Sequence, residues 1–78
     1  MIGRLYIEYL TRVKDPVIIR QSVDQISEAG LAFNNPRALN ALYENLHTLH
    51  EAKSGQPELS NYIQGMMEKV EQRLSAMK

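Results

Sequence analysis

Three proline residues divide this sequence into four segments in which apolar residues recur with a helical period. The prolines occur in the pairs Asp15-Pro16, Asn35-Pro36 and Gln56-Pro57. Proline is tolerated in the first turn of a helix because the N–H it lacks would have no partner there, whereas inside a helix it breaks the hydrogen-bond ladder. We therefore expect each pair to mark the start of a helix.

The fold class that follows is all-α, a small antiparallel bundle of three to four helices in a single domain, 1–78. The expected helices span about 2–14, 16–30, 36–53 and 58–76. A domain of 78 residues buries only about 60% of the surface that its unfolded chain exposes, so its stability is marginal. Binding to a partner would add to that stability.

The composition argues against several classes of partner. The chain has no cysteine, and its nine basic residues balance nine acidic ones. Without disulfides a reducing compartment and a cytoplasmic location are expected. Mixed charges give no long-range field that attracts nucleic acid or anionic lipid. Charged residues also interrupt the apolar N-terminus, so we expect no signal peptide and no membrane partner.

The first segment is expected to form a short amphipathic helix. Its apolar residues share one helical stripe, Ile2, Leu5, Tyr6, Tyr9, Leu10 and Val13. A strand over 5–10 is the alternative, since this stretch is rich in strand-forming residues. The helix is favoured because the alternation of a strand fails at Tyr6 and no turn or second strand follows.

The second helix begins after Asp15, which can accept a hydrogen bond as its N-cap. Ser22 and Gly30 lie on the apolar stripe of this helix, where small residues would let a neighbouring backbone approach. Gly30 has a second possible role, since a glycine can end a helix in the left-handed conformation, with Leu31 folding back on Ile26. We favour that termination at Gly30.

The third helix is the best defined, with Asn35 as its N-cap and Lys53 and Gly55 as its stop signals. The fourth begins near Pro57 or Ser60 and has a near-heptad stripe, Leu59, Ile63, Met66, Val70, Leu74 and Met77. About 20 residues make a rod of roughly 30 Å, longer than its neighbours in the chain require. We expect part of its stripe to reach another molecule.

Two histidines are the only candidates for metal chemistry. Glu44 and His47 have the Glu-x-x-His spacing of di-iron bundles, but Glu44 lies opposite the leucine stripe of its helix and should be solvated. His47 and His50 together supply only two ligands. We expect no metal and no cofactor. His50 lies on the apolar stripe and is a candidate pH-dependent group at an interface.

Nothing in the sequence indicates an enzyme. The serines have no histidine or carboxylate at a spacing that suggests a catalytic triad, and no Gly-x-Ser-x-Gly turn is present. A DNA-binding helix-turn-helix over the second and third helices is an alternative function. Its recognition helix would offer a single cation, Arg37, near its start.

The run 35–43, Asn-Pro-Arg-Ala-Leu-Asn-Ala-Leu-Tyr, resembles the turn and following helix of type III secretion needle subunits. The chain length is also similar. The resemblance covers about ten residues, while the apolar N-terminal helix and the break at 55–57 depart from the hairpin of the needle. It implies a second alternative function, a subunit of a secretion-type helical assembly.

The function that we expect is a non-catalytic protein–protein interaction module, such as an adaptor, co-chaperone or assembly subunit, acting on itself or on a protein partner. Four tyrosines lie on or beside apolar stripes, where they suit either the edge of a core or an interface, Tyr6, Tyr9, Tyr43 and Tyr62. The methionines of the fourth helix would make that surface adaptable. The expected contact residues are Tyr62, Met66, Met67, Val70 and His50.

Overall fold

A computed structural model describes residues 4–77 and confirms the all-α bundle. It has four helices, α1 (Arg4–Arg12), α2 (Pro16–Phe33), α3 (Pro36–Ala52) and α4 (Pro57–Ala76). All three prolines stand in the first turn of a helix, as predicted. The helix predicted for the first segment is confirmed, and the alternative strand over 5–10 is not formed, because α1 includes these residues.

The N-caps differ in strength as their side chains predict. The Asp15 carboxylate accepts a hydrogen bond of 2.9 Å from the backbone N–H of Val17. The Asn35 side chain accepts two, from the N–H groups of Arg37 at 2.8 Å and Ala38 at 3.3 Å. Gln56 makes no capping bond through its side chain, yet α4 still begins at Pro57 and not at Ser60.

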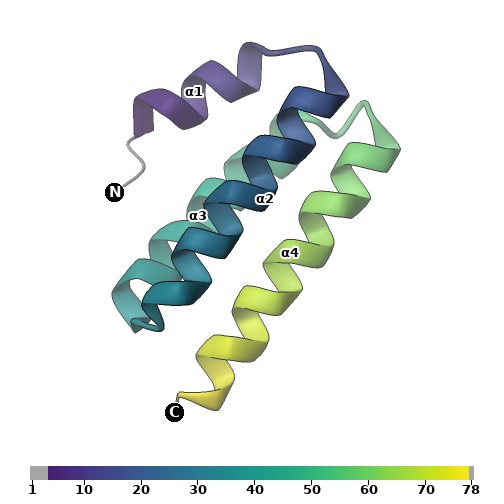
Figure 1. Cartoon of the computed structure of the whole chain (residues 1–78). Helices are drawn as coiled ribbons and strands as arrows, with labels where there is room; N and C mark the ends of the chain where they lie inside the picture. Colours follow the sequence, from purple (N-terminus) through teal and green to yellow (C-terminus); the bar gives the residue numbers. More distant parts are fainter. Residues whose placement is uncertain (1–3, 78) are drawn as a thin grey trace.

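Helices α2, α3 and α4 lie along the long axis of the molecule, with α3 antiparallel to both α2 and α4, and α1 lies across one end of the bundle (Figure 1). Each connection is short, 13–15, 34–35 and 53–56. Short connections favour antiparallel packing of successive helices. The principal extents are 36 × 23 × 17 Å, so the molecule is a flattened rod.

One aliphatic core joins all four helices, and only Met67 in it is not Leu, Ile or Val. Its members are Ile7, Leu10, Ile19, Val23, Ile26, Leu39, Leu42, Leu46, Leu49, Leu59, Ile63, Met67 and Val70. Helix α1 departs from the expected stripe. It buries Ile7 and Leu10, whereas Leu5 and Tyr9 remain 80% and 56% exposed. Apolar residues occupy several sides of this short helix, so its sequence period alone does not determine which side faces the core.

The predicted end of the second helix at Gly30 is wrong. The helix continues to Phe33 and ends at Asn34, whose φ of 50° and ψ of 42° are left-handed. Asparagine tolerates this conformation better than most residues. Gly30 instead has its other predicted role, since a Cβ there would lie 2.6 Å from the Leu42 Cδ2 atom. Its missing side chain allows α2 and α3 to approach closely.

The remaining helix limits differ from prediction by a few residues. The structure places α1 at 4–12 within the predicted 2–14, whose residues 2 and 3 lie outside the described residues. Helix α3 ends at Ala52, one residue early. The 20 residues of α4 exceed the 18 of α2 by only two, so its extra length is about 3 Å. Leu74 and Met77 are partly buried against the core.

We expect opposite effects from alanine at two helical glycines. Gly65, in α4, has no atom near the position of an added Cβ, so Gly65→Ala should raise the free energy of unfolding by about 0.5–1 kcal/mol through helix propensity. Gly30→Ala gains the same propensity but crowds Leu42, and we expect a net loss of about 1 kcal/mol. Urea unfolding measures both. Equal stabilisation would show that Leu42 can move aside at no cost.

Candidate functional site

The predicted contact residues of α4 do not all lie on the surface. Met67 is 3% exposed and Val70 is fully buried, because α4 turns this side toward α2 and α3. These two side chains cannot reach a partner while the bundle stays closed. The structure keeps Tyr62 and Met66 only partly buried, packed against the core. Their contact with a partner stays a prediction.

Tyr62 already has a partner within the chain. The Arg20 guanidinium of α2 lies over its ring, with Cζ 4.9 Å from the ring centroid. At this distance a cation is attracted to the face of the ring. The pair joins α2 to α4 at the surface, which favours a structural role for this tyrosine.

The two histidines form separate contacts. His50 is partly buried, and its Nε2 atom lies 3.0 Å from the Ser60 hydroxyl oxygen, joining α3 to the start of α4. His47 is exposed and lies 3.3 Å from the Glu51 carboxylate one turn later. Within residues 4–77, no group of three or more His, Cys, Asp or Glu side chains is arranged to hold a metal ion.

Lys53 is a charged residue that is unexpectedly buried. It is 4% exposed, and its ammonium group donates hydrogen bonds to the backbone carbonyls of Thr11 at 3.1 Å and Val13 at 2.6 Å. These carbonyls lie at the C-terminal end of α1, where a cation is favourable. The sequence predicts that Lys53 marks the end of α3. In the structure its side chain also binds the C-terminal end of α1.

Large apolar side chains remain exposed at the end of the bundle where α1 lies. Leu5 and Tyr9 share one side of α1 with Tyr6, which is 38% exposed, and the two tyrosine rings stack with centroids 6.3 Å apart. The Tyr6 hydroxyl donates to the Ser22 oxygen of α2 at 3.1 Å, one turn after Ile18, which is 42% exposed. We name these four residues, Leu5, Tyr6, Tyr9 and Ile18, the tyrosine face.

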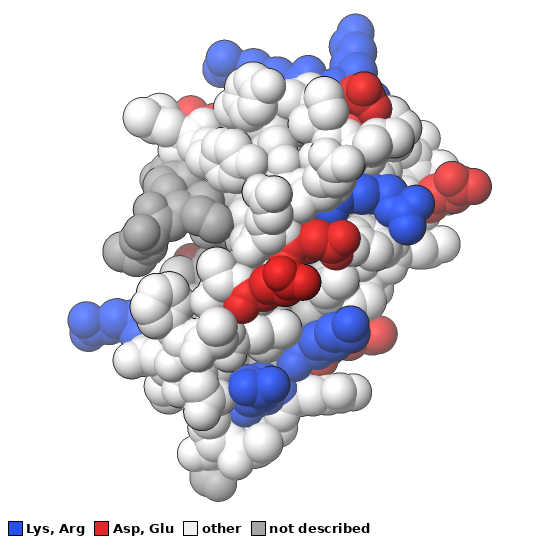
Figure 2. All heavy atoms as spheres, viewed as in Figure 1, with Lys and Arg blue, Asp and Glu red and all other residues white. Residues whose placement is uncertain are grey.

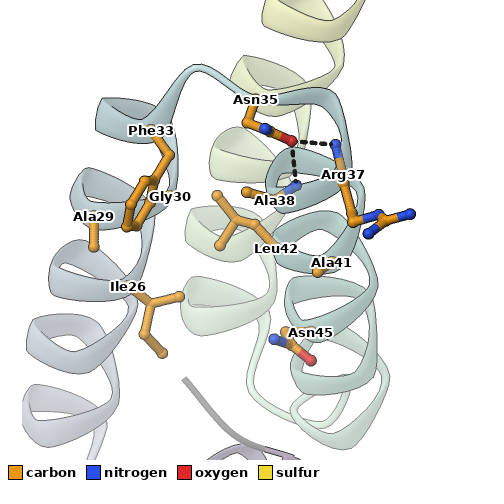
Figure 3. A pocket seen from close by; sticks show the side chains of 10 residues that line it. All are labelled: Ile26, Ala29, Gly30, Phe33, Asn35, Arg37, Ala38, Ala41, Leu42 and Asn45. Carbon is orange, nitrogen blue, oxygen red and sulfur yellow. Dashed lines mark hydrogen bonds between the residues drawn. The ribbon is translucent and has the colours of Figure 1, made fainter. Parts of the chain in front are cut away.

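A groove of about 430 Å³ runs between α2 and α3 on the half of the bundle away from α1 (Figure 3). Its lining is mostly small or apolar, Ile26, Ala29, Gly30, Phe33, Asn35, Arg37, Ala38, Ala41, Leu42 and Asn45. In Figure 3 the side chains of Ile26 and Leu42 point toward the opposite helix, and the Arg37 side chain extends away from α2. Phe33 is 72% exposed at one end of the groove.

Sequence reasoning missed this groove. Gly30, Ala38 and Ala41 indicate the groove in the sequence. Small residues on the facing sides of two helices allow either a close approach of the helices or a hollow between them. Phe33 is a second signal, since it is the single phenylalanine of the chain and phenylalanine is among the residues most often buried. The structure leaves it exposed instead.

Charged side chains of both signs are interspersed over the face seen in Figure 2, without a large area of one sign. Helices α2 and α3 run antiparallel (Figure 1), whereas the two helices of a helix-turn-helix meet at about 90–120°.

Among the residues described, no helix combines the length and apolar character needed to cross a membrane.

Comparison with known proteins identifies no relative: no family model, curated protein or solved structure matches this chain. The candidate surfaces therefore rest on their own geometry.

Replacing Lys53 should loosen α1 selectively. In Lys53→Met the aliphatic part of the side chain remains but both hydrogen bonds to α1 are lost, and we expect the free energy of local opening of α1 to fall by about 1–2 kcal/mol. Amide hydrogen exchange measures this helix by helix. Lys69→Met, at an exposed position in α4, is the control. Equal exchange of α1 in both variants would contradict the anchoring role.

Tyr43 and Glu71 provide a pH-dependent contact between α3 and α4. The Tyr43 hydroxyl donates to Glu71 Oε1 at 2.9 Å, and this bond, with smaller effects of desolvation and the carboxylate charge, raises the pKa of Tyr43 above 10.0. A raised pKa means that the contact contributes below pH 10 and is lost as pH rises through the folded value. In Glu71→Gln the pKa of Tyr43 should therefore fall back toward 10.0.

The ionisation of Tyr43 can be followed by absorbance near 295 nm, assigned with a Tyr43→Phe variant. Glu58→Gln, which removes an exposed carboxylate elsewhere on α4, should leave the titration unchanged. An unchanged titration in Glu71→Gln would show that the hydrogen bond is not populated in solution.

Proposed function

We propose that this chain is a non-catalytic protein–protein interaction module and that the tyrosine face is its contact surface. The observation that supports the proposal is the exposure of Leu5 and Tyr9, at 80% and 56%, on a helix that is otherwise anchored to the bundle. Single exposed apolar residues are common, but neighbouring large ones are typical of binding sites.

The residue types support contact with protein. Tyrosine is enriched at interfaces because it buries a large area and loses little side-chain freedom, while its hydroxyl stays hydrogen-bonded. Tyr6 is already held by Ser22 and by stacking on Tyr9. A side chain that is fixed before binding loses less entropy on binding.

The anchoring of α1 also fits this function. Ile7 and Leu10 are buried, and the Lys53 ammonium group binds the carbonyls at the end of the helix. Helix α1 is therefore held at its inner side and at its C-terminal end, and its outer side is presented as a rigid surface. Such a surface suits an adaptor, co-chaperone or assembly subunit of the reducing cytoplasm whose partner is another protein or a second copy.

Photocrosslinking from the full chain tests the proposal. A benzoylphenylalanine at position 9 should yield a discrete crosslinked product, with the purified chain alone or in cells that express it. Adding Leu5→Ser to the same chain should weaken the crosslink by about tenfold or more, as expected when a central apolar contact is lost. A probe replacing Gln72, at an exposed polar position on α4, is the control.

The proposal fails if position 9 gives no discrete product and the chain sediments as a strict monomer at millimolar concentration. A product formed only by a probe replacing Met66 would assign the contact to α4 instead. Phe33→Ser removes an apolar side chain of similar exposure from the opposite end of α2. It should leave a crosslink from position 9 to another protein intact.

A further inference from the structure

The groove between α2 and α3 continues the surface on which α1 packs. Tyr6 of α1 bonds to Ser22, and the groove begins at Ile26, one turn further along α2. Helix α1 lies across one end of the bundle (Figure 1), and the groove lies between α2 and α3 toward the other end. The uncovered half is therefore a place for a second short helix.

The large side chains of the tyrosine face complement the small side chains that line the groove. The groove is lined by small residues, Ala29, Gly30, Ala38 and Ala41, whereas α1 projects Leu5 and Tyr9 outward. Large side chains on one helix fit into hollows between small ones on another. The lengths also match, since α1 has nine residues, about 13 Å, and the groove follows α2 over 26–33, about 10 Å.

The two surfaces offer one pair of opposite charges, Glu8 and Arg37. Arg37 is the one charged residue among those that line the groove, and it lies at the end near Phe33. Glu8 is exposed on α1, between Leu5 and Tyr9 in sequence. A carboxylate near the guanidinium would orient an incoming helix, although an exposed pair adds little affinity.

We propose that the groove binds the tyrosine face of a second copy of this chain, with Glu8 of one copy beside Arg37 of the other. This inference rests on the proposed function and names its partner. In this orientation Leu5, about 4.5 Å from Glu8 along α1, lies inside the groove near Ala41, and Arg12 lies beyond the open end of the groove. The contact joins two different surfaces, so repeated contacts build a ring or an open filament.

Mixing two variants tests this head-to-tail contact. Leu5→Ser removes the projecting residue, and Ala41→Gln, at an exposed position, fills the groove. Each variant alone should self-associate about tenfold or more weakly than the unchanged chain in sedimentation velocity. Their mixture retains one intact contact and should form heterodimers but nothing larger. Circular dichroism of each variant checks that the fold is retained.

Charge reversal tests the orientation. Glu8→Arg and Arg37→Glu should each weaken self-association by about threefold to fivefold at low salt. An equal mixture of the two charge-reversed chains should recover association between unlike chains, because both contacts between them, position 8 of either chain with position 37 of the other, pair an arginine with a glutamate. A loss that mixing does not recover would overturn the pairing of Glu8 with Arg37.

Amide chemical shifts on dilution locate the contact. Shifts in both Leu5–Tyr9 and Ala38–Ala41 are expected. Shifts confined to the tyrosine face would indicate a symmetric dimer and overturn the inference, as would a strict monomer at millimolar concentration. If position 9 crosslinks to another protein while the chain stays monomeric, the inference fails and the proposed function stands.

Discussion

The hydrogen bonds from Lys53 to the carbonyls of Thr11 and Val13 hold the C-terminal end of α1 against the end of α3. A cation is placed in a largely apolar setting, where the desolvation cost is offset by two carbonyls and by the negative end of the helix dipole. Because α1 is held across the end of the bundle, it covers only part of the surface between α2 and α3. Both candidate surfaces, the tyrosine face and the groove, follow from that placement.

The architecture could be predicted because proline and the N-cap residues act locally. Asp15 and Asn35 cap the helices that they precede, and a heptad-like pattern identified the buried residues of α4 to within one position, with Met67 in place of Met66. Gly30 misled the prediction because glycine serves two purposes, ending a helix and allowing close packing. Which purpose applies depends on Leu42, a residue of another helix.

The candidate surfaces were harder to predict because they depend on what remains uncovered after packing. Helix α1 has apolar residues on several sides, and its packing against α3 places Ile7 and Leu10 in the core. The same packing leaves Leu5 and Tyr9 outside. Part of the α4 stripe was expected to reach another molecule because the helix was expected to be longer than its neighbours, but α4 exceeds α2 by only two residues.

The two-residue connection Asn34-Asn35 has a consequence for the order of folding. It joins α2 to α3 directly, so every residue that lines the groove belongs to the continuous stretch 26–45. Contacts between residues close in sequence close small loops and form early. The groove is thus built by one helical hairpin, whose two helices can meet before α4 docks on them.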